Sequence, residues 1–236
     1  MIEEWQLAGF WGPRGESDQE CACRWQRFFE KLEELGSEAL GGWGLRARSR
    51  SAVRELALEQ SNLANVVRKG QTTAEETGYV FGAWNRRDAP RSVGFSAHCG
   101  VATSVVLNVA YLTLDTAGEQ DVRRWAGLAG AMMRALVEAW EPDWGFFVTN
   151  SLRDRQQDRE PRAPAAGYVT YLARGRARAV PRNLDGRIDT TAGDGALISL
   201  VEPDGGLPPA EKVLRLARTL RKSGSFAPAP LDRPHL

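Results

Sequence analysis

The sequence predicts an α+β fold, a single domain in which helices pack mainly on one face of a largely antiparallel sheet of about six strands. Three observations lead to this prediction. Helical and strand-like segments follow one another in the order ααβββαβββα, which lacks the regular alternation of a doubly wound parallel sheet. The helical segments carry one apolar stripe each, and no Pro/Gly/Ser-rich linker divides the chain into halves.

The first helix is expected to begin at Ser17. Ser17 and Glu20 have the spacing of a capping box, in which each side chain binds the backbone N–H of the other residue. Gly36 is a typical helix stop. The apolar stripe between these ends consists of Cys21, Trp25, Phe28, Phe29, Leu32 and Leu35. Trp11 and Pro13 are expected to pack against the approach to this helix.

A second helix is expected from Ser51 to Gly70, with Val53, Leu56, Leu63 and either Val66 or Val67 facing inward. Three strand-like segments follow, at residues 78–85, 92–100 and 103–114. The short breaks between these segments favour a three-stranded antiparallel meander.

A long third helix is expected to end at Trp140, before Pro142, and Thr116 with Glu119 has the spacing of a second capping box. Further strands are predicted at 144–150, 167–174 and 195–201, and a last helix follows Pro208 and Pro209. We expect residues 1–226 to form one domain and residues 227–236 to be a flexible tail.

Composition limits the class of protein. The 236 residues are 42% hydrophobic and 26% charged, with a formal net charge of +1, which is typical of a globular protein and not of a disordered one. The chain has no secretory signal pattern and no apolar run near the roughly 18 residues of a membrane span. Its three cysteines lack zinc or thioredoxin spacing, which suits a reducing compartment. Together these features lead us to expect a cytoplasmic protein that does not bind a membrane.

Charge is unevenly distributed along the chain. Acidic residues dominate before residue 46, whereas the segment 153–187 is rich in arginine. A basic segment of this kind raises the alternative of a nucleic-acid-binding module, but the net charge near zero favours solvated surfaces instead. We therefore expect no direct contact with nucleic acid.

Catalytic and metal-binding patterns are sparse. His98 and Cys99 are neighbours in a predicted strand, so their side chains leave opposite faces of the sheet. Cys21 and Cys23 are about 200° apart around the predicted helix and cannot share a metal ion. The chain has neither a Gly-Lys pair for a P-loop nor a G-x-G-x-x-G helix start. The sequence therefore predicts no cofactor, no metal and no catalytic set.

One pair of carboxylates remains as an alternative. Glu141 and Asp143 flank Pro142 between Trp140 and Trp144, and two carboxylates beside aromatic rings are compatible with the acid/base pair of a hydrolase. The competing interpretation is a helix end with two solvated acidic residues.

A series of motifs resembles the immunity protein 52 family, which is found beside bacterial polymorphic toxins. The motifs, in chain order, are FWGPRGESDQECACR, FFEKLEEL with the later Trp43, GYVFGAWNRRD, FSAHCG, VEAWEPDWGFF, GYVTYL and GDGALISL. One departure is Arg86, where the family pattern leads us to expect a glycine turn after Asn85. The motif residues expected to be structural are Trp11, Gly12, Pro13, Arg14, Cys21, Trp84, Asn85, Cys99, Gly100, Trp140, Pro142 and Trp144. Arg14 is expected to pair with a carboxylate, and a direct contact with the toxin is the alternative.

This resemblance implies a non-enzymatic antidote that binds and neutralises a cognate toxin by non-covalent occlusion, as part of interbacterial competition. It also implies that the toxin is a nuclease with a restriction-endonuclease-like fold. Carboxylates that mimic phosphate would then contact the toxin, and the candidates are Glu16, Asp18, Glu30, Glu33, Glu34, Glu141 and Asp143. The oligomeric state is left open.

Overall fold

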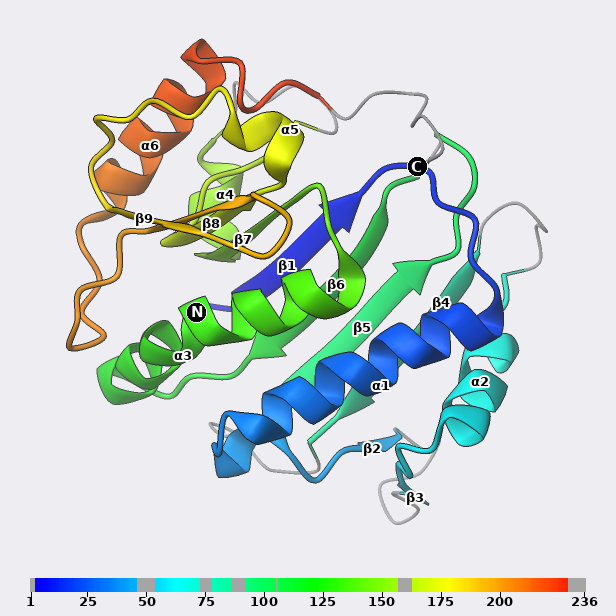
Figure 1. The fold of residues 1–236 in the computed structure, drawn as a ribbon. Coiled ribbons are helices and arrows are strands. Elements are labelled where there is room, and N and C mark those ends of the chain that lie inside the picture. The colour runs from blue at the N-terminus through cyan, green and yellow to red at the C-terminus, as the bar shows by residue number, and fades with distance from the viewer. Residues whose placement is uncertain are drawn as a thin grey trace.

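The computed structural model describes residues 3–45, 54–72, 78–85, 92–104, 106–156 and 163–228. Ten strands in these ranges form one sheet in the order β3-β2-β4-β5-β6-β1-β7-β8-β10-β9, with antiparallel neighbours throughout (Figure 1). The strands are β1 (Trp5–Trp11), β2 (Gly44–Leu45), β3 (Arg54–Glu55), β4 (Tyr79–Trp84), β5 (Val93–Cys99), β6 (Asn108–Leu114), β7 (Trp144–Thr149), β8 (Val169–Leu172), β9 (Arg187–Thr190) and β10 (Ala196–Ser199). The α+β class is confirmed, but the expected count of about six strands was too low.

Six α-helices lie within the described ranges: α1 (Asp18–Glu34), α2 (Gln60–Lys69), α3 (Glu119–Trp140), α4 (Asn150–Asp154), α5 (Arg174–Ala177) and α6 (Ala210–Lys222). A 3₁₀ turn, Glu38–Leu40, follows α1. The capping box of α1 is confirmed, because Glu20 N donates to Ser17 Oγ at 3.2 Å and Ser17 N donates to Glu20 Oε2 at 2.7 Å.

Two predicted helix starts were wrong. The second helix begins at Gln60, not Ser51, because the chain before it joins the edge of the sheet: β3 pairs with β2, and Leu56 N donates to Trp43 O at 3.0 Å. Residues 51–53 lie outside the described ranges. The N-cap of α3 is Gly118, and Asp121 Oδ2 accepts from Ala117 N at 2.9 Å in place of the expected Thr116 box.

The strand β1, to which the sequence analysis assigned no strand, is central to the sheet. It pairs with β6 along one edge and with β7 along the other, and so joins the two halves of the chain. Its sequence WQLAGFW lacks polar alternation because most of both its faces are buried. Periodicity alone cannot distinguish a buried strand from a buried helical segment in a short apolar run of this kind.

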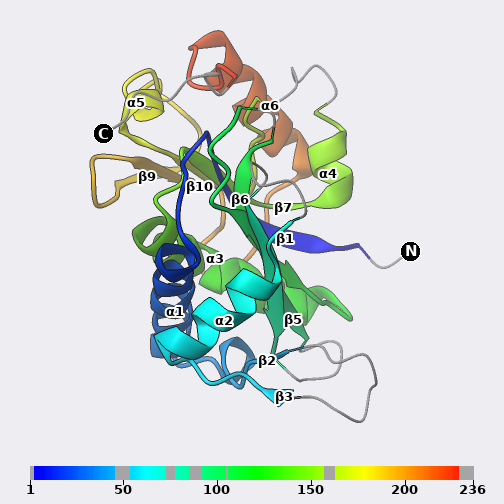
Figure 2. The same cartoon turned by 90° about the vertical axis from the view of Figure 1, so that its right-hand side faces the viewer.

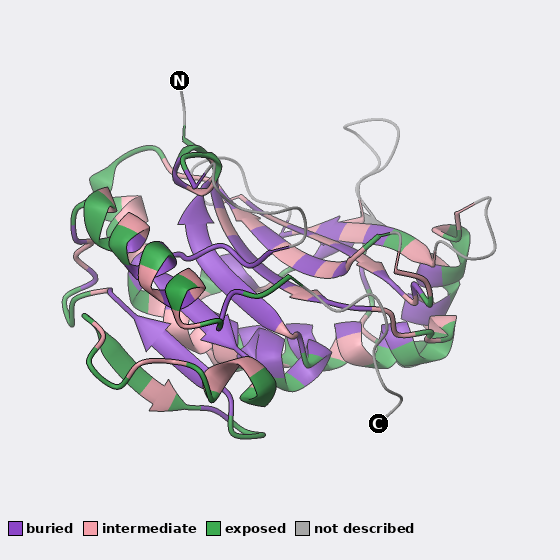
Figure 3. Cartoon of the chain, turned by 90° about the horizontal axis from the view of Figure 1, so that it is seen from above, coloured by how far each residue is buried: buried purple, intermediate pink, exposed green. Residues whose placement is uncertain are grey.

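Helices lie on both faces of the sheet, whereas the sequence predicted packing mainly on one face. Helices α1, α2 and α3 lie on one face, whereas α4 and α6 lie on the other face at the β7–β8–β10 end (Figure 2). These three strands are buried on both faces. In β4, β5 and β6, by contrast, buried residues alternate with half-exposed or exposed ones, as the striped strands in Figure 3 show.

Candidate functional site

The first motif segment, residues 10–24, folds into a cluster of ion pairs at the carboxyl end of α3. Glu16, whose side chain is only 5% exposed, forms an ion pair with Arg14 Nε at 3.1 Å and accepts a hydrogen bond from Arg24 Nε at 2.5 Å. Arg24 Nη1 also contacts Glu141 Oε2 at 3.0 Å. Burial by itself would lower the pKa of the Arg24 guanidinium, but the charges of Glu16 and Glu141 outweigh burial and raise it.

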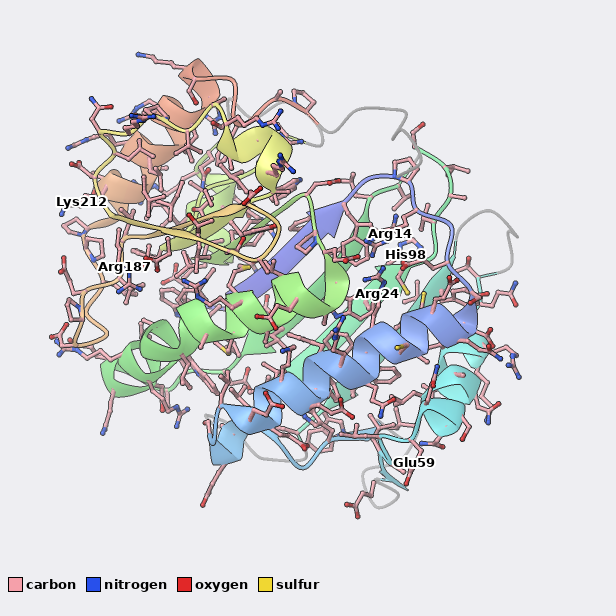
Figure 4. The ribbon with its side chains drawn as sticks, in the orientation of Figure 1. Arg14, Arg24, Glu59, His98, Arg187 and Lys212 are labelled. Carbon is pink, nitrogen blue, oxygen red and sulfur yellow. The ribbon has the colours of Figure 1, made fainter. Side chains whose placement is uncertain are left out.

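The same two arginines cap the end of α3. Arg14 Nη2 donates to the carbonyl of Trp140 and Arg24 Nη1 to that of Ala139, each at 2.9 Å. Arg14 reaches this point from the segment between β1 and α1, and Arg24 reaches it from α1 (Figure 4). Arginine at the carboxyl end of a helix satisfies free carbonyls and opposes the helix dipole. Arg14 thus pairs with a carboxylate and ties the segment before α1 to α3, whereas Arg24 ties α1 itself to α3.

Glu141 and Asp143 have separate structural partners. Glu141 adopts a left-handed backbone, with φ of 48°, and its side chain contacts Arg24. Asp143 Oδ2 accepts from Gly12 N at 2.9 Å. Pro142 between them is buried and lies over Gly9 of β1. This geometry gives no support to a hydrolase acid/base pair.

Other motif residues hold loops and helices to the sheet. Asn85 Nδ2 donates to Ala39 O at 2.9 Å, and Asn85 Oδ1 accepts from Val93 N at 3.0 Å. Gly100 has φ of +76°, and a Cβ there would lie 2.8 Å from Glu16 O. Arg86, where a glycine was expected, lies outside the described residues.

The aromatic motif residues, Trp11, Trp140 and Trp144, are buried. Trp11 stacks on Trp140 with ring centroids 5.6 Å apart, and Trp144 stacks on Phe10 at 4.1 Å. Pro13 is half-buried beside Trp11, whereas Trp84 is half-buried on the side of the sheet away from α1.

Two contacts in this region were missed from the sequence. The buried Asn108 binds two loops, since its Nδ2 donates to Gly12 O at 2.8 Å and its Oδ1 accepts from Val101 N at 2.9 Å. The thiols of Cys21 and Cys99 are both buried and hydrogen-bonded to each other. Burial is the main cause that raises the pKa of the Cys99 thiol, and the bond with Cys21 adds to it.

The acidic candidates fall into different environments. Glu16 is buried in the arginine cluster, and Asp18 Oδ2 contacts Arg68 Nη2 of α2 at 2.6 Å. Glu30, Glu33 and Glu34 are exposed at the carboxyl end of α1.

Several arginines of the segment 153–187 pair with acidic side chains. Arg155 pairs with Glu211 at 3.4 Å, Arg174 with Asp194 at 3.6 Å and Arg187 with Asp189 at 3.2 Å. Such pairing gives these arginines local partners within the fold. Arg159 and Arg162 lie outside the described residues.

A depression of about 480 Å³ lies against the β4–β5–β6 part of the sheet. It is lined by Glu4, Gly82, Ala83, Ser92, Gly94, Phe95, Ser96, Tyr111, Thr113 and Asp115, a set that includes neither Glu141 nor Asp143. The sequence analysis did not select it, although small and polar residues alternate with apolar ones along 92–100. Among the described residues there is no group of three or more His, Cys, Asp or Glu side chains that could hold a metal ion. No helix within the described ranges is long and apolar enough to span a membrane.

Comparison with known proteins gives a family and a structural neighbour. A family model described as immunity protein 52 matches residues 3–225. Among solved structures, the Pseudomonas aeruginosa T6SS protein PA0821 is similar, with a TM-score of 0.53 and 10% sequence identity. That similarity covers 93% of this chain and 73% of the other, and at this identity it shows the fold alone. No curated protein matches the chain.

The fold is that of an α+β protein in which several motif residues bind groups of the protein itself. The family match extends over nearly the whole chain, so the protein belongs to the immunity protein 52 family.

Proposed function

We propose that this protein binds a cognate bacterial toxin and neutralises it by non-covalent occlusion. The match to the immunity protein 52 family over residues 3–225 carries this proposal. The structural use of Glu141 and Asp143 supports an inhibitor over a hydrolase, because both carboxylates bind groups of the protein itself. The protein acts in the cytoplasm of the cell that it protects.

The proposed toxin is a nuclease, possessing a basic cleft for its nucleic-acid substrate. Glu30, Glu33 and Glu34 are exposed together and would attract such a cleft, whereas Glu16 and Asp18 are engaged with arginines. Steering of this kind raises the association rate more than the final affinity.

Protection against a few toxin molecules requires tight binding. A Kd of about 1 nM corresponds to roughly −12 kcal/mol. An interface of about 1,600 Å² with a few desolvated aromatic or arginine anchors is sufficient for that affinity.

The test is co-expression with the toxin encoded by the neighbouring gene. Bacteria that express the toxin alone should die, whereas bacteria that also express this chain should survive, and the two proteins should elute as one complex. The association rate should fall as salt increases, because long-range attraction is screened. Cell death despite soluble expression of this chain, with no complex, would contradict the proposal.

A further inference from the structure

One sheet surface of this protein lacks a helical cover among the described residues. We call it the open face: the side of β4, β5 and β6 turned away from α1 and α2. Its residues are Val80, Gly82 and Trp84 of β4, Gly94, Ser96 and His98 of β5, and Val109, Tyr111 and Thr113 of β6. All of them are half-exposed or exposed, and Val80 reaches 48%. Figure 2 shows α1 and α3 on the opposite side of these strands.

Small residues form the floor of the depression on this face. Gly82 is opposite Ser96, and Gly94 lies between Trp84 and Thr113 on the two neighbouring strands. A Cβ at Gly94 would meet only Thr113 Cβ, at 3.8 Å, so the position has room for a side chain. Glycine inside a strand weakens it, and such a position often marks close approach of another molecule.

The chemistry of the depression is acidic at one end and aromatic at its sides. Glu4 and Asp115 are the charged residues of its lining, and no Lys or Arg is among those residues. Arg153 lies nearby, where it donates to Gln6 Oε1 at 3.1 Å. Its charge already has an acidic partner, because it also contacts Asp154 Oδ1 at 3.1 Å. Tyr111 of the lining, with Trp84 elsewhere on the open face, contributes the aromatic groups that are common at the energetic centre of protein interfaces.

We infer that the open face is the surface on which the toxin docks, with a segment of the toxin that carries a lysine or arginine seated in the depression. This inference rests on the proposed function. The cation meets Glu4 and Asp115, while its neighbours cover Gly94 and pack on Tyr111. Binding there is a short-range contact, distinct from the long-range attraction expected of the exposed carboxylates of α1.

The test measures binding of the purified toxin, from the neighbouring gene, to the full chain and its variants. Gly94→Trp fills the depression, and Gly127→Trp is the matched control, because Gly127 is exposed on α3 with no atom within 4 Å of its Cβ position. We expect Gly94→Trp to raise the Kd about 100-fold or more, and Gly127→Trp to bind as the unmodified chain does.

A second pair of variants separates contact from steering. Glu4→Gln with Asp115→Asn and Glu33→Gln with Glu34→Gln change the net charge equally. The first pair should raise the dissociation rate about tenfold, whereas the second should alter only the association rate.

The outcomes are distinct. If the toxin binds the unmodified chain and Gly94→Trp equally well, or if only the α1 variants speed dissociation, the docking site is wrong while the proposed function stands. If the toxin does not bind the unmodified chain, both proposals fail. A free chain that dimerises, and becomes monomeric with Gly94→Trp, would assign the open face to a second copy and overturn the inference.

Discussion

Glu16 is the residue on which the motif cluster depends. Its carboxylate is held between Arg14 and Arg24, whose side chains are 18% and 23% exposed. Removing the charge of Glu16 leaves two partly buried guanidinium groups with one carboxylate fewer. Removing one partner of a buried ion pair leaves the other charge buried without compensation. The resulting loss of stability is larger than the net stabilisation that the intact pair provides.

We therefore predict that Glu16→Gln lowers the free energy of unfolding by about 2 kcal/mol. The matched control is Glu141→Gln, because Glu141 contacts the same arginines with a side chain that is 65% exposed, and its loss should change stability by less than about 1 kcal/mol. Urea denaturation of both variants measures the difference. Equal effects would mean that burial does not set the strength of this cluster.

At the scale of elements, the contact of β1 with α3 depends on two facing glycines. A Cβ at Gly9 would collide with Leu136 Cδ2 and lie 3.1 Å from Pro142 Cβ. Its partner on β7, Gly145, would place a Cβ 2.7 Å from Ala8 O and 3.0 Å from Met133 Sδ. The helix lies this close to the sheet because neither glycine has a side chain.

Gly9→Val should accordingly destabilise the protein by about 2–3 kcal/mol, since the added atoms force α3 away from the sheet. Gly127 lies in α3 at a position with open space around it. Gly127→Ala should therefore stabilise the protein by about 0.5–1 kcal/mol. Thermal unfolding compares the two. A Gly9→Val variant as stable as the unmodified chain would show that α3 shifts without cost.

The sequence predicted the elements whose signals are local. The capping box at Ser17, the stripe of α1 and the stop before Pro142 all depend on residues within a few turns of one another. It missed β1 because the alternation of a strand disappears when both faces are buried, and it missed β2 and β3 because they are two residues long.

The candidate site was less predictable, because its contacts are distant in the chain. Arg14 and Trp140 are 126 residues apart, and Asn108 and Gly12 are 96 apart. From the sequence, Cys23 was the cysteine to consider beside Cys21, because the two are neighbours in the chain. In the structure Cys21 contacts Cys99 instead, which is distant in the sequence. The open face likewise depends on which side of the sheet the helices cover. No pattern of neighbouring residues in the sequence determines that side.

For the molecule as a whole, the three cysteines report on global unfolding. Cys23 is exposed, whereas Cys21 and Cys99 are fully buried between α1 and β5. A thiol reagent should modify one cysteine rapidly in the native protein and the other two only at the rate of unfolding. In guanidinium chloride all three should react together. Rapid modification of two cysteines under native conditions would mean that α1 separates locally from the sheet.

The same thiols make stability depend on pH. The folded protein raises the pKa of Cys99, chiefly through burial, so the native state holds the thiol proton at a pH where the unfolded chain releases it. The stabilisation from Cys99 is complete below the ordinary thiol pKa, about 8.5, and is lost as pH rises above it. We predict that the free energy of unfolding falls above pH 8.5 by up to about 1.4 kcal/mol per pH unit from this group. Cys99→Ala should reduce that slope, and Cys23→Ala, the control at an exposed position, should leave it unchanged. A Cys99→Ala variant with an undiminished slope would mean that another group controls stability at alkaline pH.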